Sequence, residues 1–205
     1  MQTTHGGPAT SFSSDDSGKT AARQLYRDRR RAFAATLDAS AREALLRDLA
    51  LVCAPLTQLG AARAAPIASY AAIGAEIDPQ FVEADFGPHA FPRIEGRLLR
   101  FHVAAWSELV PGPLKIPQPR ADAPEVRPQL LLVPLIAATP AGVRLGQGGG
   151  FYDRTLEQLR RDGTVVTVGL AWDCQMAEML PREAHDVLLD WIATPTRLFE
   201  CARNR

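Results

Sequence analysis

Apolar positions recur at helical spacing in the N-terminal third of the chain. The segment 19–37 is rich in Arg and Ala, with apolar residues at helical intervals, and it predicts a helix. A second helix is predicted after Ser40, because Ser40 and Glu43 fit a capping box and Gly60 provides a stop. Its apolar face comprises Leu45, Leu49, Val52 and Leu56.

The later apolar segments predict strands. The near-continuous apolar run at 130–136 is typical of a central parallel strand that is covered on both faces, and 164–171 predicts the next buried strand. Because a helix over 150–161 separates these two strands, we expect them to be parallel neighbours. Shorter strands are predicted at 66–74, 98–103 and 191–194. This alternation predicts an α/β fold with a mostly parallel sheet and flanking helices.

Composition divides the chain into a tail and one domain. Residues 1–18 contain little besides Thr, Ser, Gly, Asp and Pro and predict a disordered tail, so we expect a single α/β domain over 19–205. The proline-rich stretch 107–129 is expected to be an excursion over the surface. The N-terminus lacks the basic and apolar regions of a signal peptide, and no apolar run is long enough to span a bilayer. We therefore expect a cytoplasmic protein.

The charge balance argues against polyanionic partners. The 23 Lys and Arg residues equal the 23 Asp and Glu residues in number, so no strong net field attracts nucleic acid or anionic membranes. The Arg-rich run 27–31 predicts a solvated helix face rather than a nucleic-acid contact. Only Lys19 and Lys115 are lysines among the basic residues, which weakly favours a specific role for each. We expect a monomer that binds small molecules, with neither nucleic acid nor membrane as a partner.

The segment 144–154, Arg-Leu-Gly-Gln-Gly-Gly-Gly-Phe-Tyr-Asp-Arg, carries the clearest chemical signal. Its glycines let the backbone approach a ligand closely, and the helix that follows offers free N–H groups and the positive end of its dipole to a phosphate. Arg144 adds a forked cation. No Lys follows the glycines, which excludes a P-loop, and Phe151 replaces the last glycine of the dinucleotide-binding pattern. A glycine-rich turn without a ligand is the alternative.

Two aspartates are candidate metal ligands. Asp153 lies in the first turn of the predicted helix, where a carboxylate would repel a phosphate unless a cation lies between them. Mg²⁺ commonly takes one or two carboxylates together with phosphate oxygens. Asp186, which precedes the last predicted strand, is the second candidate, with a surface-loop residue as the alternative. Cys174 has no His placed to activate it and predicts a buried thiol rather than a nucleophile.

In their order along the chain these motifs resemble the 5-formyltetrahydrofolate cyclo-ligase family, also called 5,10-methenyltetrahydrofolate synthetases. The most specific part is Leu132-Val-Pro134 followed by the segment 144–154. The other matching motifs are Lys19-x3-Arg23, Tyr70-x5-Glu76-Ile-Asp78, 168–175, Leu180-Pro181, His185-Asp186 and 192–195. The chain departs from the pattern in its shorter segment 78–94 and in its small residue Ala71.

The resemblance implies an enzyme that uses ATP and Mg²⁺ to close 5-formyltetrahydrofolate to 5,10-methenyltetrahydrofolate, through a phosphorylated formyl group, with release of ADP and phosphate. It implies catalytic roles for Lys19, Arg144 and Tyr152, and Mg²⁺ ligation by Asp153 and Asp186. The implied ATP-binding residues are Lys19, Arg23, Arg144, Leu145, Gly146, Gln147, Gly148, Gly149, Gly150, Phe151 and Tyr152. The implied folate-binding residues are Ala71, Glu76, Gln147, Gly148, Gly149, Gly150 and Phe151. A non-catalytic folate- or nucleotide-binding relative is the alternative.

Overall fold

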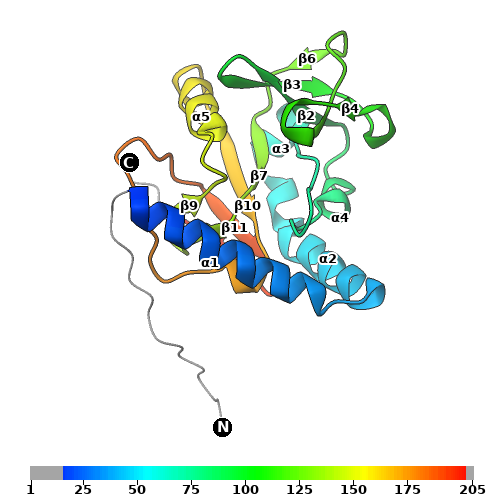
Figure 1. Ribbon diagram of the computed structural model, residues 1–205. Coiled ribbons are helices and arrows are strands. Elements are labelled where there is room, and N and C mark those ends of the chain that lie inside the picture. The colour runs from blue at the N-terminus through cyan, green and yellow to red at the C-terminus, as the bar shows by residue number, and fades with distance from the viewer. Residues whose placement is uncertain (1–15, 202–205) are drawn as a thin grey trace.

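A computed structural model describes residues 16–201, and two helices open this part of the chain (Figure 1). Helix α1 (Asp16–Ala35) begins before Lys19, so residues 16–18 of the predicted tail belong to a helix instead. Burial of Gly18 and Lys19 against the body of the protein explains this extension, because most helical stability in proteins comes from packing. The remaining residues assigned to the tail, 1–15, lie outside the described part.

Helix α2 (Ala39–Cys53) has a different cap from the predicted one. Asp38 is its N-cap and accepts a hydrogen bond from the amide of Ala41 at 2.8 Å, whereas Ser40 lies inside the helix. The helix also ends well before Gly60, because Pro55 has no N–H to continue the ladder. The chain continues as a 3₁₀ turn, η1 (Ala54–Gln58), and a short helix, α3 (Gly60–Ala64).

An eight-stranded sheet has the order β12-β11-β10-β7-β1-β2-β3-β6, and its five inner strands, from β11 to β2, are parallel. Strands β12, β3 and β6 are antiparallel to their neighbours. The bounds are β1 (Ile67–Ala68), β2 (His89–Glu95), β3 (Leu98–Val103), β6 (Glu125–Val126), β7 (Leu130–Pro134), β10 (Val166–Leu170), β11 (Trp191–Thr194) and β12 (Arg197–Glu200).

The predicted α/β class and the parallel pairing of β7 with β10 are confirmed, with Leu130 opposite Val166 and Pro134 opposite Leu170. The strands predicted at 98–103 and 191–194 are also confirmed. The strand predicted at 66–74 is wrong in length, because β1 ends at Ala68. Sequence patterns also missed β2 and β12, since neither has the continuous apolar run of a central strand.

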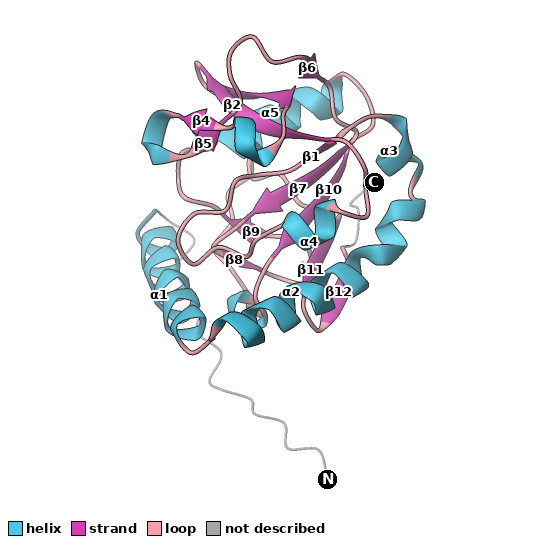
Figure 2. Ribbon diagram, turned by 90° about the vertical axis from the view of Figure 1, so that its right-hand side faces the viewer, coloured by secondary structure: helices cyan, strands magenta, loops and turns pink. Residues whose placement is uncertain are grey.

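Helices cover both faces of the sheet (Figures 1 and 2). On one face, α2 packs on side chains of the inner strands that include Leu130, Leu132 and Val168. On the other face, α5 (Phe151–Arg161) packs through Leu156 on the alternate side chains, among them Leu131. This alternation is the two-residue period of a strand that is buried on both sides.

Helix α1 lies at the carboxyl ends of the inner strands. Its residues Ala22 and Tyr26 pack on Ile136 and Ala137, which follow β7. The chain passes from β1 to β2 on one side and later places β7 on the other side of β1, so the strand order reverses between β1 and β7. In open α/β sheets, ligands bind outside the carboxyl ends of the strands at such a switch point. The topology therefore predicts a ligand-binding site at the loops after β1 and β7.

Short elements complete the fold. They are α4 (Gln80–Glu83), η2 (Trp106–Glu108), β4 (Val110–Pro111), η3 (Pro113–Lys115), β5 (Pro117–Gln118), β8 (Ala137–Ala138), β9 (Arg144–Leu145) and η4 (Asp173–Gln175). The stretch 107–129 is more than the predicted surface excursion, because its β4–β5 hairpin folds back and buries Gln118. Within residues 16–201, the helices are all too short or too polar to cross a membrane.

Candidate active site

A pocket of about 410 Å³ lies at the switch point. Helix α1 lines it with Lys19 and Arg23, the loop after β1 contributes Ala71 and Glu76, and the loop before β11 contributes Asp186. The segment that joins β9 to α5 supplies the rest of the predicted set: Arg144, Leu145, Gly146, Gln147, Gly148, Gly149, Gly150, Phe151, Tyr152 and Asp153. One pocket thus contains every residue that the sequence assigned to ATP, folate or Mg²⁺.

The glycine-rich loop leaves β9, a short strand paired with β8, rather than the central strand β7. Two of its glycines have positive φ: Gly148 at 101° and Gly150, the N-cap of α5, at 63°. A side chain is disfavoured at such angles, which explains the residue type. Cations hold two carbonyls of the loop: Arg23 Nε donates to Gly146 at 3.1 Å, and Arg154 Nη2 donates to Gly149 at 2.7 Å.

The predicted phosphate-binding cations contact the predicted metal ligands. Lys19 Nζ lies 2.7 Å from Asp186 Oδ2, and Arg144 Nη2 lies 2.5 Å from Asp153 Oδ1. Lys19 is only 5% exposed, so it is a buried cation although it lies in the first turns of α1. Burial lowers the pKa of Arg144, and the carboxylate of Asp153 opposes that shift, so the guanidinium stays charged.

Asp153 contacts the backbone of the loop before β11, which also carries Asp186. Asp153 Oδ1 accepts a hydrogen bond from the amide of Val187 at 3.2 Å, directly after Asp186. Burial favours a raised pKa for Asp186, but hydrogen bonds from the Glu183 amide and Lys19 outweigh it and hold the pKa below its ordinary value. Asp186 is therefore a carboxylate at neutral pH.

The residues present fit a hard divalent cation. Asp153 Oδ2 and Asp186 Oδ1 receive no hydrogen bond from a described residue, and carboxylate oxygens are the donors that Mg²⁺ prefers. Ligand atoms of Glu183, His185 and Asp186 lie within 4.8 Å of one another, a group of described residues that does not include Asp153. Sequence reasoning did not single out Glu183, although the spacing Glu-x-His-Asp could have indicated it.

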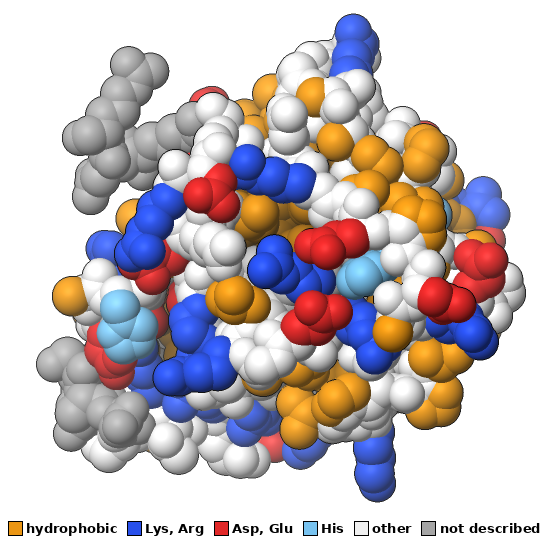
Figure 3. Space-filling view, turned by 90° about the horizontal axis from the view of Figure 1, so that it is seen from above, with side chains coloured by type: hydrophobic (Ala, Val, Ile, Leu, Met, Phe, Trp, Pro, Cys, Tyr) orange, Lys and Arg blue, Asp and Glu red, His pale blue; other side chains and the backbone are white. Residues whose placement is uncertain are grey.

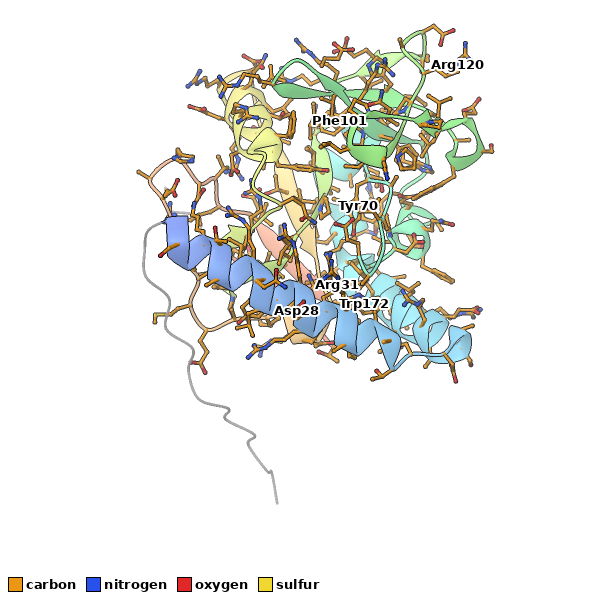
Figure 4. All side chains as sticks on the ribbon, in the orientation of Figure 1. Asp28, Arg31, Tyr70, Phe101, Arg120 and Trp172 are labelled. Carbon is orange, nitrogen blue, oxygen red and sulfur yellow. The ribbon has the colours of Figure 1, made fainter. Side chains whose placement is uncertain are left out.

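The opposite wall of the pocket is apolar and comes from segments that were not assigned to the site. Its side chains include Pro92, Ile94, Leu99, Leu114 and Ile116, from β2, β3 and the β4–β5 hairpin. Tyr70 also lines the pocket and donates a hydrogen bond from its hydroxyl to Ile77 at 2.7 Å. In the view of Figure 4, Tyr70 lies between α1 below and the β2–β3 hairpin above. The pocket therefore has a charged half and an apolar half.

The Arg-rich run of α1 is only partly the solvated face that the sequence predicted. Arg29 and Arg31 are exposed, but Arg30 is buried and its Nη1 lies 3.7 Å from Glu76 Oε1. Ala22, Tyr26 and Arg30 follow one another every four residues on the buried face of the helix, a signal that sequence reasoning overlooked. Cys174 is half-buried rather than buried as predicted, and this burial raises the pKa of its thiol to about 11, in agreement with a thiol that is not a nucleophile.

Surface charge shows no dominant sign on the face seen in Figure 3, where Lys and Arg side chains are interspersed with Asp and Glu side chains. This mixing matches the zero formal net charge of the chain. A neutral, mixed surface together with a pocket of about 410 Å³ suits a small-molecule ligand better than a polyanion.

Comparisons with known proteins agree with these motifs. Residues 90–195 match the model of the 5-formyltetrahydrofolate cyclo-ligase family. The chain is 42% identical over 117 residues to the 5-formyltetrahydrofolate cyclo-ligase of Escherichia coli (strain K12), a match that covers 55% of this chain and 64% of that protein. The matched part is thus less than two thirds of that relative. A protein of the same name from Haemophilus influenzae is 43% identical over 76 residues, which cover 35% of this chain and 40% of that protein.

Solved structures extend the likeness of the fold. The NMR structure of the 5,10-methenyltetrahydrofolate synthetase of Aquifex aeolicus superimposes with a TM-score of 0.71 at 24% identity, covering 91% of this chain and 94% of that one. A Mycoplasma pneumoniae synthetase gives a TM-score of 0.63 at 20% identity, over 86% and 98% of the two chains. Because the family model spans more than half of the residues and the fold agrees over nearly all of them, the chain belongs to the 5-formyltetrahydrofolate cyclo-ligase family.

Proposed function

We propose that this protein closes 5-formyltetrahydrofolate to 5,10-methenyltetrahydrofolate at the expense of ATP, with ADP and phosphate as the other products. The observation that carries the proposal is the single pocket that gathers the predicted ATP, folate and Mg²⁺ residues at the switch point of the sheet. Its charged half suits a triphosphate, and its apolar half suits a flat heterocycle.

On the charged side, Lys19, Arg23 and Arg144 would bind the phosphates together with the glycine-rich loop and the N-terminus of α5. Lys19 and Arg144 contact Asp186 and Asp153 in the protein alone. When the nucleotide binds, phosphate oxygens would take over these two cations, and the two carboxylates would hold the accompanying Mg²⁺. The exchange of partners keeps every buried charge paired, which limits the desolvation cost of binding. A bound Mg²⁺ supplies positive charge that neutralises phosphate oxygens.

On the other side, Glu76 would accept hydrogen bonds from the N–H donors of the pterin ring. Each of its carboxylate oxygens takes one hydrogen bond from the protein: Oε2 from the Ile73 amide at 3.1 Å, and Oε1 from Gln147 Nε2 at 3.3 Å. Each oxygen has a further lone pair for a ligand. Ala71 and the apolar wall would contact the ring faces, with Gln147 at the boundary between the two halves.

This arrangement suits a reaction that depends on positioning. The formyl oxygen attacks the γ-phosphorus of ATP and ADP leaves, which converts a poor leaving group into a phosphate ester. N10 of the folate then attacks the formyl carbon and loses its proton, and phosphate departs with the formyl oxygen. Phosphoryl transfer needs alignment and charge stabilisation more than a covalent protein group. Lys19 and Arg144 would stabilise charge on the transferred group, and Tyr152 would pack beside it in the pocket.

The test is a spectroscopic assay of ring closure. Purified protein is incubated with 5-formyltetrahydrofolate, ATP and Mg²⁺, and the absorbance of the methenyl product is followed. We expect turnover that requires both ATP and the metal. Binding of both ligands by calorimetry without product formation would instead favour a non-catalytic relative. Absence of both binding and turnover in a folded protein would refute the proposal.

A further inference from the structure

Helix α1 places an arginine behind the folate half of the pocket. Arg30 is 7% exposed and occupies the position on the buried face that follows Ala22 and Tyr26 at four-residue intervals. Its Nη1 donates to the carbonyl of Leu135 at 3.2 Å and lies 3.7 Å from Glu76 Oε1. Arg30 does not line the pocket, so it reaches a ligand only through its neighbours.

Burying the charged guanidinium of Arg30 costs free energy, which the structure must offset. Its Nε is buried and has no hydrogen-bond partner among residues 16–201. A buried guanidinium with an unsatisfied N–H destabilises the fold unless an opposite charge nearby compensates for its desolvation. An opposite charge on Glu76, itself 8% exposed, is the compensation that the structure supplies.

Several groups of the protein act on the pKa of Glu76. Burial raises the pKa of Glu76, and the Ile73 amide, Arg30 and Gln147 act in the opposite direction. Two phenols face the same carboxylate, Tyr70 from the loop after β1 and Tyr152 from α5, and burial keeps both neutral by raising their pKa values. Arg30 is thus the charged group that favours the anionic form of Glu76.

A second arginine of the same helix fixes the other partner of Glu76. Arg27 Nη2 donates to Gln147 Oε1 at 2.8 Å, which turns the amide nitrogen of Gln147 toward Glu76. Helix α1 therefore orients the Glu76 carboxylate twice, through Arg30 directly and through Arg27 by way of Gln147. The geometry is that of a carboxylate prepared to accept hydrogen bonds from a ligand.

We infer that Arg30 is a positioning residue for the folate: its buried guanidinium holds Glu76 as an oriented carboxylate that can accept N–H donors of the pterin ring. The inference rests on the proposed function. It assigns a role to an arginine that touches neither substrate nor nucleotide. The planar fork of arginine can serve the Leu135 carbonyl and the Glu76 carboxylate together, which the ammonium of lysine does less well.

The experiment compares Arg30→Met with Arg31→Met, a matched control on the same helix. Arg31 is exposed and, among residues 16–201, forms an ion pair with Asp28 alone, and Figure 4 shows both of these residues on α1. KM values for 5-formyltetrahydrofolate and for ATP are measured across pH. We expect Arg30→Met to raise the folate KM about 10- to 150-fold, the loss of one charge-assisted hydrogen bond between the pterin and Glu76, and to leave the ATP KM within about twofold.

The pH profile separates positioning from mere packing. Removal of Arg30 raises the pKa of Glu76, so folate binding should fail at a higher pH than in the wild type as the pH falls. Arg30→Lys, which retains a charge, should move this midpoint less than Arg30→Met does. In a Glu76→Gln background no carboxylate is left to orient, so Arg30→Met should change the folate KM by less than about threefold.

An unchanged folate KM and pH midpoint in folded Arg30→Met would overturn the inference, as would an equal loss in the Glu76→Gln background. If Arg30→Met does not fold, Arg30→Gln takes its place, and failure of both to fold would assign Arg30 a structural role instead. A wild-type protein without folate binding or turnover would refute the proposed function. An active wild type whose Arg30 variants keep the folate KM and pH midpoint of the wild type would refute this inference alone.

Discussion

Lys19→Ala tests the nucleotide half of the pocket most directly. The substitution removes a buried ammonium that lies 2.7 Å from Asp186 and 3.2 Å from Glu183. If Lys19 binds a phosphate of ATP, the variant loses a charge-assisted hydrogen bond of about 1.5–3 kcal/mol, which corresponds to roughly a 10- to 150-fold loss in kcat/KM for ATP. The KM for the folate should change little, because Lys19 contacts Asp186 and Glu183, whereas Glu76 contacts Gln147 and Arg30.

The same substitution also has a cost in stability. Removing one partner of a buried ion pair costs about 3–5 kcal/mol, whereas an exposed pair contributes about 0–1 kcal/mol. The side chains of Asp186 and Glu183 are 16% and 32% exposed, and Asp186 keeps its hydrogen bond from the Glu183 amide, so we expect about 1–2 kcal/mol. For a chain of this size, that loss lowers Tm by roughly 2–8 °C. The variant should therefore stay folded at assay temperature.

The measurement is initial rate against ATP at saturating 5-formyltetrahydrofolate and Mg²⁺, together with a thermal melt. Arg31→Ala serves as the control, since its side chain is 69% exposed and should change either quantity little. A folded Lys19→Ala protein with wild-type dependence on ATP would refute the assignment of Lys19 to the phosphates. A large fall in Tm with normal ATP kinetics would show that the lysine serves the fold alone.

Three further outcomes are expected. Asp153→Asn and Asp186→Asn should each reduce the rate strongly, and the double variant should be little worse, because the two residues would act as one metal site. Titration of activity with Mg²⁺ checks this. A loss in the double variant equal to the sum of the two single losses in activation free energy would contradict it. Gly148→Ala should destabilise the protein by about 1 kcal/mol, because Gly148 has a positive φ that alanine disfavours. Gly60→Ala at the start of α3 is the control and should not destabilise the protein. Chemical denaturation measures the free energy of unfolding of both variants. Because partial burial raises the pKa of Cys174 to about 11, little thiolate exists at neutral pH. Thiol reagents should therefore react slowly with the native protein, and rapid inactivation would count against an inert thiol.

Several local features follow from the sequence because their causes are local. The run 130–136 is apolar at consecutive positions, which only a strand covered on both faces tolerates, and β7 is such a strand. The glycines at 148 and 150 adopt positive φ, a conformation that residues with a side chain rarely adopt, so the residue type at these positions follows from the local backbone. The motif order along the chain likewise indicated the family that the comparisons confirm.

Other features depend on chain segments that meet only in the folded state. Asp38 and Ser40 are both acceptable N-caps by residue type, and only the folded chain shows that Asp38 occupies the cap position. The length of β1 was misjudged because the apolar residues after Ala68, including Tyr70, turn into the pocket instead of extending the strand. The apolar wall was missed because β2, β3 and the β4–β5 hairpin supply single side chains from separate places.

The sequence by itself determined the residue types of the site and the class of fold, because glycine conformation, apolar periodicity and charge are properties of short segments. Tertiary structure alone decided which charges meet. Lys19 and Asp186 are 167 positions apart in the chain, and Arg30 reaches Glu76 from a helix whose charged run resembles an ordinary solvated surface. The partners of a buried charge are set by packing across the sheet and its covering helices, and the interior tolerates such a charge only where the fold supplies an opposite one.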